Sequence, residues 1–311
     1  MTKGESVTGL IFSEEVETAL SDGRPVVALE STILTHGLPK PDNLRIGQEI
    51  EAEIRSAGAV PATIAVLDGT ARIGLSTPDL VRLCSMDDAV KLSRRDLGVA
   101  LSKGWTGGTT VAATMILAAR AGIEVFATGG IGGVHRGAEL DLDISADLDE
   151  LARTSVMVVS AGAKSILDLP KTLEVLETKG VPVIGYGTDE FPAFFCRASG
   201  LRVPLRLDSS EEIAAAWRAG RDLGLETGML IANPVPEEHA LDRATMERII
   251  DDALFEAKRT GATGKQVTPY LLSQIRAATG GASLTTNIAL VRANARLGAG
   301  IAVALGTLRQ N

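Results

Sequence analysis

Lys164 is the residue whose type and position point most directly to chemistry. It follows an apolar segment at 155–160 (SVMVVS) through the small residues of 161–163 (AGA). In a parallel α/β sheet, ligands bind beyond the carboxyl ends of the strands. A lysine amine placed there can attack an electrophilic carbon, or it can bind a phosphate through its charge. Both interpretations of Lys164 stay open on position alone.

Carboxylates that could exchange protons or bind a cation occur at two places. Glu30 directly follows the apolar segment 26–29 (VVAL), where a carboxyl could act as a general acid or cap a helix. The segment 141–147 (DLDISAD) would place Asp143 and Asp147 on one side of an extended chain. Without Cys or several His nearby, such a group favours Mg²⁺ or Mn²⁺; the alternative is a solvated acidic loop with helix-capping aspartates.

A third candidate region is suited to phosphate. The segment 107–110 (GGTT) precedes an apolar helical stretch at 111–121, so backbone N–H groups and the hydroxyls of Thr109 and Thr110 would stand at a helix N-terminus. The alternative is a tight loop with threonine caps. Lys91 could add a positive charge for the phosphate, or belong to a solvated basic surface.

Other glycine-rich and polar positions narrow the choice of function. The segment 129–133 (GGIGG) lacks the GxGxxG spacing of dinucleotide-binding folds, and no segment completes a P-loop. His36 and Asn287 could each be structural or bind a polar ligand edge. Dinucleotide chemistry and P-loop phosphotransfer are therefore disfavoured.

The elements that must position these residues alternate between strands and helices. We expect strands at 26–29, 63–67, 123–128, 155–160 and 181–186, helices at 43–57, 111–121, 169–179 and 210–223, and a C-terminal helix at 286–305 that packs on the sheet or against another subunit. This rhythm predicts an α/β protein, a three-layer α/β/α sandwich around a mainly parallel or mixed sheet. Without linker or repeat, one domain over 1–311 is expected.

Composition limits the partners and the compartment. The chain has 31 basic and 39 acidic residues, a net charge of −8, and no basic stripe, so a nucleic acid polymer is not expected. Cys84 and Cys196 stand in unrelated contexts, as in a reducing compartment. No signal core and no run of about 18 uninterrupted apolar residues occurs, so we expect a cytoplasmic protein without a membrane partner.

Several segments together resemble the pseudouridine-5′-phosphate glycosidase family, also called indigoidine synthase A-like. They follow the family's order over roughly residues 10–305: 28–37 (ALESTILTHG), 60–65 (VPATIA), 93–96 (SRRD), 128–137 (TGGIGGVHRG), 143–148 (DISADL), 187–194 (GTDEFPAF), 233–234 (NP) and 287–290 (NIAL).

The resemblance implies reversible cleavage of pseudouridine 5′-phosphate to uracil and ribose 5-phosphate by a homotrimeric α/β/α enzyme with a divalent cation, commonly Mn²⁺. It implies that Lys164 is the nucleophile, Glu30 the proton donor and Asp143 the metal ligand. The substrate-binding positions that it implies are Lys91, Val111, Ser145, Ala146 and Asp147, and also His135 and Asn287 for the base or phosphate. We expect Thr109, Thr110 and Thr128 to bind substrate as well.

These residue types fit the reaction, because a carbon–carbon glycosidic bond offers no leaving heteroatom to protonate, and two carboxylates alone suit it poorly. In our hypothesis Lys164 attacks C1′ while Glu30 protonates the ring oxygen, which gives an opened sugar adduct. Uracil is then expelled, with Asp147 transferring the proton at the base, and the remaining imine is hydrolysed by water. A sugar-phosphate aldolase, a phosphotransferase, or a non-catalytic accessory of an indigoidine pathway are the alternatives.

Overall fold

The computed structural model describes residues 9–260 and 267–310. Its strands are β1 (Leu10–Phe12), β2 (Val26–Leu29), β3 (Val60–Leu67), β4 (Thr70–Ile73), β5 (Val90–Leu92), β6 (Gly107–Thr109), β7 (Val125–Ala127), β8 (Met157–Ser160), β9 (Val183–Tyr186), β10 (Leu205–Leu207) and β11 (Met229–Ala232). Its helices are α1 (Glu14–Ser21), α2 (Asp42–Ser56), α3 (Thr77–Ser85), α4 (Arg94–Lys103), α5 (Val111–Arg120), α6 (Ala138–Asp141), α7 (Ala146–Leu151), α8 (Leu169–Thr178), α9 (Ser210–Asp222), α10 (Arg243–Thr260), α11 (Val267–Ala278) and α12 (Ala282–Gln310), with a π-helical turn η1 (Ile33–Gly37) and a 3₁₀ turn η2 (Glu237–His239).

The main part of the sheet is parallel, in the order β3-β2-β7-β8-β11-β9-β10. Its central strands β2, β7, β8 and β11 are apolar and buried along their whole length. Strands covered by helices on both faces read as continuous apolar runs, which is why these segments show no polar alternation. Their carboxyl ends lie at one edge and carry Glu30, Thr128 and the loop to Lys164.

A second, mixed sheet branches from β3. The first half of β3 pairs in parallel with β2, while its second half pairs antiparallel with β4 and β6, and β5 adds in parallel to β6. Strand β6 needs glycine, because a Cβ on Gly107 would lie 2.2 Å from the Val90 carbonyl oxygen and one on Gly108 2.5 Å from Thr35 Oγ1. The segment expected as a loop before the apolar helix is therefore a strand as far as Thr109.

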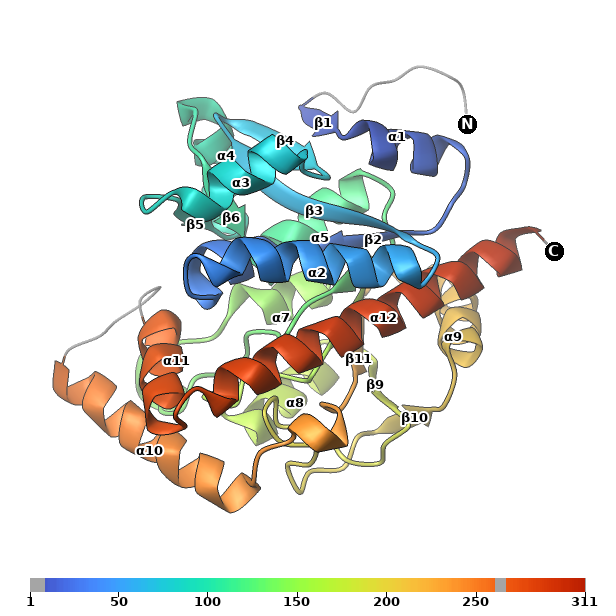
Figure 1. Ribbon diagram of the computed structural model, residues 1–311. Coiled ribbons are helices and arrows are strands. Elements are labelled where there is room, and N and C mark those ends of the chain that lie inside the picture. Colours follow the sequence, from blue (N-terminus) through green and yellow to red (C-terminus); the bar gives the residue numbers. More distant parts are fainter. Residues whose placement is uncertain (1–8, 261–266, 311) are drawn as a thin grey trace.

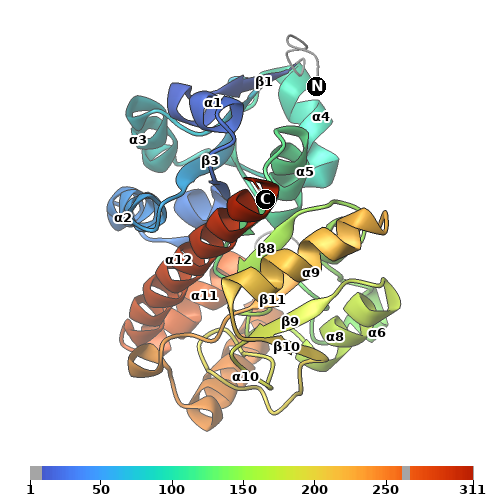
Figure 2. The ribbon, with the colours of Figure 1, turned by 90° about the vertical axis from the view of Figure 1, so that its right-hand side faces the viewer.

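Helices cover both faces of the parallel part. Helix α12 crosses one face between α2 and α9 and packs on β2, β7 and β8, while α5 packs on β2 and β3 from the other face and against α7 (Figures 1 and 2). A Cβ on Gly298 would lie 3.4–3.6 Å from side chains of β2 and β7, so glycine lets α12 approach the sheet closely. The predicted three-layer sandwich is confirmed.

Helix α12 is also the predicted C-terminal helix, and it packs on the sheet. Residues Ala282–Arg309 are long and apolar enough to cross a membrane by length and composition, with a mean hydropathy of 1.5, but 61% of that window is buried inside the fold. This burial is that of a core helix, which is the common explanation for such a window in a globular protein.

Candidate active site

A cavity of about 480 Å³ lies at the carboxyl ends of β2, β7 and β8. Its lining includes nearly every position proposed from the sequence: Glu30, Lys91, Thr110, Val111, Thr128, His135, Asp143, Ser145, Ala146, Asp147, Lys164 and Asn287. Ligand pockets of α/β proteins form at this edge, where loops from neighbouring strands converge. Residues distant in sequence thus meet at one site.

Thr109 is the proposed position that the fold does not bring to the cavity. It is fully buried; its N–H donates to Ser31 Oγ (2.9 Å) and its hydroxyl donates to the Ile64 carbonyl (2.7 Å). The hydroxyl also accepts from Thr114. Thr109 therefore ties β6 and α5 to β3, and its neighbour Thr110 is the residue that faces the cavity.

The Lys164 backbone is fixed by pairing between two glycine-containing loops. Its N–H donates to the Ile131 carbonyl (3.0 Å), and the Ile131 N–H donates to the Gly162 carbonyl (3.1 Å). The side chain lines the cavity. Among the described residues, no carboxylate lies within 4 Å of the Lys164 ammonium and no hydrogen bond holds it. The amine is thus placed for a ligand by its backbone alone.

Glu30 is buried and held by two hydroxyl groups. Thr128 donates to its Oε1 and Thr32 donates to its Oε2. All three side chains are at most 8% exposed. Because a hydroxyl can donate or accept, these partners accommodate the carboxyl group with or without its proton. Such a carboxyl is suited to proton transfer.

Asp147 is buried and joins two helix N-termini. Its carboxylate accepts the Ala112 N–H in the first turn of α5 (2.9 Å) and the Gly132 N–H (2.8 Å), while its own N–H donates to Ser145, the N-cap of α7 (3.2 Å). Thr110 caps α5. Two helix N-termini at one end of the cavity favour an anionic group such as phosphate.

Of the two interpretations of the segment 141–147, the extended run of carboxylates is wrong. Asp141 ends the short helix α6 and is exposed, whereas Asp147 lies in α7 and turns into the protein. Of the carboxylates in this segment, Asp143 and Asp147 line the cavity and Asp141 does not. Local helix capping by Ser145 overrode the alternation that the sequence suggested.

His135 lies beside Asp143 at the cavity. Its Nδ1 is 3.9 Å from Asp143 Oδ2, and the Asp143 side chain is 45% exposed. Burial lowers the pKa of His135, and the charges of Lys164 and Lys91 lower it further, against the opposing carboxylates of Asp143 and Asp141. The two lysines therefore act on the same region of the cavity.

A cation at this site would have few protein ligands. Among the described residues, no three His, Cys, Asp or Glu side chains converge as a metal-binding group. Asp143, half-exposed at the cavity, fits a hard cation that keeps several waters and takes further oxygens from a substrate. The donor set thus suits Mg²⁺ or Mn²⁺ and does not suit a fully protein-coordinated metal.

Further basic and apolar side chains, outside the positions predicted to bind substrate, complete the lining. Arg94 makes a bidentate contact with buried Glu150 (2.5 and 3.0 Å), which fixes the start of α4. His36 of η1, open on sequence grounds, lies at the cavity with its Nδ1 2.7 Å from the Thr35 hydroxyl. Phe194 and Leu272 add apolar wall. Phe194 belongs to the segment 187–194 that carries the resemblance, but only the tertiary fold places it and Leu272 at the cavity.

The family pattern described as indigoidine synthase A-like protein matches residues 15–304. The chain belongs to this family. Among its relatives, proteins named pseudouridine-5′-phosphate glycosidase are 56% identical over 300 residues in Nocardioides sp. (96% of this chain, 98% of that protein) and 57% identical over 297 residues in Caldanaerobacter subterraneus (96% and 97%). The resemblance seen in the sequence is confirmed, as is the expectation of an enzyme.

Two solved structures of the same fold accompany these relatives. The prealnumycin C-glycosynthase AlnA in complex with ribulose 5-phosphate has a TM-score of 0.90 and 41% identity, covering 97% of this chain and 99% of that one. An indigoidine synthase A-like protein from Thermotoga maritima has a TM-score of 0.88 and 35% identity, covering 98% and 99%. The mostly parallel α/β architecture of this family member is thus shared across its whole length.

Proposed function

We propose that this protein is a pseudouridine-5′-phosphate glycosidase, which reversibly cleaves the C-glycosidic bond to give uracil and ribose 5-phosphate. The observation that carries the proposal is a backbone-fixed lysine without a carboxylate partner among the described residues, in one cavity with a hydroxyl-held carboxyl group. The names of the relatives and of the C-glycosynthase neighbour support the same bond type.

The substrate phosphate belongs at the end of the cavity formed by α5 and α7. Val111 begins α5, Ala146 begins α7, and Lys91 of β5 adds a positive charge to the same lining. Helix N-termini and a lysine together supply backbone donors and charge for a phosphate dianion. With the phosphate bound there, the sugar carbon C1′ would lie within reach of the Lys164 amine in the same cavity.

In the proposed reaction the Lys164 amine attacks C1′ as Glu30 gives its proton to the ring oxygen, which breaks the C1′–O4′ bond. Glu30 then takes the proton from the new ammonium and delivers it to the base carbon. The C1′–C5 bond breaks as nitrogen forms the imine, uracil leaves, and water hydrolyses the imine to ribose 5-phosphate and free Lys164.

This scheme changes the role expected for Asp147. Both of its oxygens already accept hydrogen bonds from backbone N–H groups, so the carboxylate holds the N-terminus of α5 and the loop 129–133 together at the phosphate end. We therefore propose that Asp147 orders the phosphate end and that Glu30 carries the proton to the base. Asp143 is the proposed ligand of Mn²⁺ or another divalent cation, which would supply charge for substrate oxygens.

The homotrimer and the cytoplasmic location remain proposals from the family. Leu140 is 89% and Leu142 78% exposed in this chain, and exposed leucines of this kind often lie in subunit contacts. Light scattering of the purified protein gives the oligomeric mass directly.

The decisive experiment follows uracil release from pseudouridine 5′-phosphate with Mn²⁺, with Mg²⁺ and after chelation. The unmutated protein releases uracil without ATP, and borohydride traps a ribose-phosphate adduct on Lys164. Lys164→Ala loses at least about 10³-fold in kcat and traps nothing. Wild-type cleavage by Lys164→Ala would overturn the covalent scheme, and no reaction in either direction would favour the accessory alternative.

A further inference from the structure

Phe194 has a backbone conformation that its residue type disfavours. Ala193 and Cys196 pair through both backbone N–H groups (3.0 and 3.3 Å), so Phe194 and Phe195 form a two-residue reverse turn. Phe194, the first central residue, has φ +60°, while Phe195 does not have positive φ. Glycine normally takes such a position because it has no Cβ.

Two other non-glycine residues with positive φ among the described residues differ from Phe194 in one respect. Asp68 and Leu142 are exposed, whereas Phe194 is 3% exposed and lines the cavity. Strained residues that the surrounding structure holds in place cluster at functional sites. A phenylalanine with positive φ at the cavity wall therefore points to a role of its ring in ligand binding.

The ring and backbone of Phe194 touch both loops that build the site. A Cβ on Gly130 would lie 2.7 Å from Phe194 Cδ2 and Cε2, so the ring packs directly on that glycine. The Phe194 N–H donates to the Ala161 carbonyl (3.1 Å), in the loop that leads to Lys164. Phe195 packs edge-on against Phe194, with 4.7 Å between ring centroids.

The loop 129–133 orders the cavity from one end to the other. Gly132 is bonded to Asp147 at the phosphate end, Ile131 is bonded to Lys164, and Gly130 lies under the Phe194 ring. If the phosphate lies near Gly132 and C1′ lies near Lys164, which is bonded to Ile131, the group attached to C1′ lies near Gly130 and Phe194. That group is the base.

We propose that Phe194 is a specificity-determining residue whose ring forms the wall against which a planar aglycone lies. This inference rests on the proposed function, since it takes the phosphate end and Lys164 as reference points. A planar heterocycle against an aromatic ring gains stacking energy that a flexible or saturated group lacks.

The test compares Phe194→Leu with Phe195→Leu, two substitutions of equally buried rings in one turn, of which only Phe194 lines the cavity. Phe194→Leu raises the inhibition constant of uracil about tenfold and leaves that of ribose 5-phosphate unchanged. Phe195→Leu leaves both constants unchanged. The inference is overturned if both substitutions raise the inhibition constant of uracil equally. It is also overturned if Phe194→Leu weakens ribose 5-phosphate binding as much as uracil binding.

A second pair of variants separates the ring's task from folding. Phe194→Gly accommodates φ +60° and melts at a higher temperature than Phe194→Ala, although both lose uracil affinity. Phe194→Ala melting above Phe194→Gly contradicts the strain argument. If the unmutated protein releases no uracil, the proposed function fails first; if it does and Phe194→Leu keeps uracil affinity, only the inference fails.

Discussion

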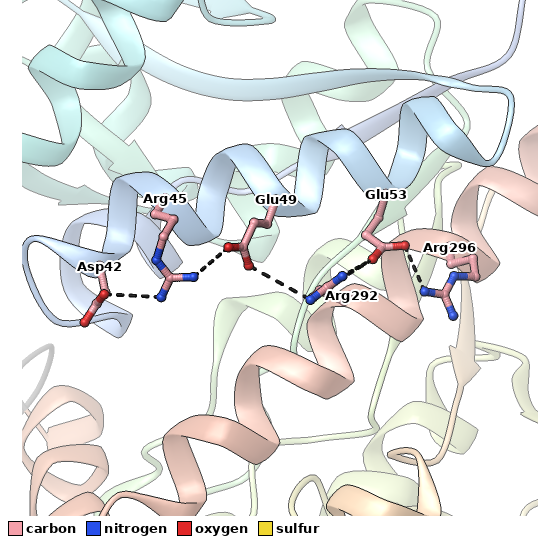
Figure 3. A network of polar contacts seen from close by, with 6 residues as sticks. All are labelled: Asp42, Arg45, Glu49, Glu53, Arg292 and Arg296. Atoms are coloured by element: carbon pink, nitrogen blue, oxygen red, sulfur yellow. Dashed lines mark hydrogen bonds and ion pairs between the residues drawn. The ribbon is translucent and has the colours of Figure 1, made fainter.

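The carboxylates of the cavity and those between α2 and α12 are held by different kinds of donor. Across the α2–α12 contact, Glu53 binds both Arg292 and Arg296, and the network extends along α2 (Figure 3). In the cavity, Glu30 is held by two threonine hydroxyls and Asp147 by two backbone N–H groups. No arginine contacts either of these carboxyl groups among the described residues.

The difference shows how the fold separates packing from chemistry. An arginine keeps its charge at all relevant pH values, so its carboxylate partner stays ionised and serves as a fixed contact. Hydroxyl and backbone N–H donors hold a carboxyl group in place without adding a positive charge beside it. A ligand or a lysine can then interact with that carboxyl group directly. Replacing a carboxylate by its amide should therefore affect mainly activity in the cavity and mainly stability at the α2–α12 contact.

Among the substitutions of carboxylates, Glu30→Gln is expected to have the largest effect. It keeps the shape of the side chain but removes the proton that the reaction transfers, so kcat falls by about 10²–10⁴-fold. Melting temperature changes little, because the amide can still bond to Thr32 and Thr128. Uracil release and thermal unfolding measure the two quantities. Near-normal kcat in Glu30→Gln, with its fold intact, would remove Glu30 from the reaction.

Asp147→Asn sharpens the distinction within the cavity. The amide nitrogen cannot accept a hydrogen bond, so either the Ala112 or the Gly132 N–H loses its partner, at about 1–3 kcal/mol of folding stability. We expect weaker inhibition by ribose 5-phosphate and a raised KM. A loss of kcat with unchanged ribose 5-phosphate affinity would instead indicate that Asp147, and not Glu30, transfers the proton to the base.

Glu150→Ala tests a carboxylate that is fully buried like those of the cavity but bound by an arginine, Arg94, which lines the cavity. Removing it leaves the guanidinium without its bidentate partner and opens a small void, which costs about 2 kcal/mol by urea denaturation. Glu247→Ala, in an exposed pair with Arg243 on α10, should change stability by under about 0.5 kcal/mol. Equal effects would contradict the importance of burial.

Glu53→Gln is expected to have the smallest effect and one that depends on pH. Hydrogen bonds from Arg292 and then Arg296 lower the pKa of Glu53 below its ordinary value of 4.5. The stability that ionised Glu53 contributes is therefore present above pH 4.5 and is lost as pH falls through the lowered pKa. At neutral pH the difference from Glu53→Gln is within about 1 kcal/mol.

Urea unfolding of both proteins between pH 7 and pH 3 checks this sign. The two curves should converge in acid, while uracil release at neutral pH stays equal. A gap that widens as pH falls would show that the arginines do not stabilise the ionised form.

The sequence predicted β2, β3, β7, β8 and β9 of the parallel part of the sheet, for a physical reason that lies within each segment, but it did not predict the central strand β11. The apolar runs that became β2 and β8 and the amphipathic stretch that became α2 are set by local periodicity. Lys164 and Glu30 were identifiable because each follows such a run. Strands β5, β6 and β10 have three residues each and include lysine, glycine or arginine, so they show no apolar run of the kind that marks the equally short β7.

Only the tertiary structure decided which residues share the cavity and what holds them. Thr109 and Thr110 are neighbours of the same type, yet the antiparallel pairing of β6 with β3 buries the first and leaves the second at the cavity. Phe194 reaches it through a turn after β9, far along the chain from Gly130. Periodicity fixes which way a segment faces, whereas contacts between segments depend on sheet order and loop closure, which no local pattern encodes.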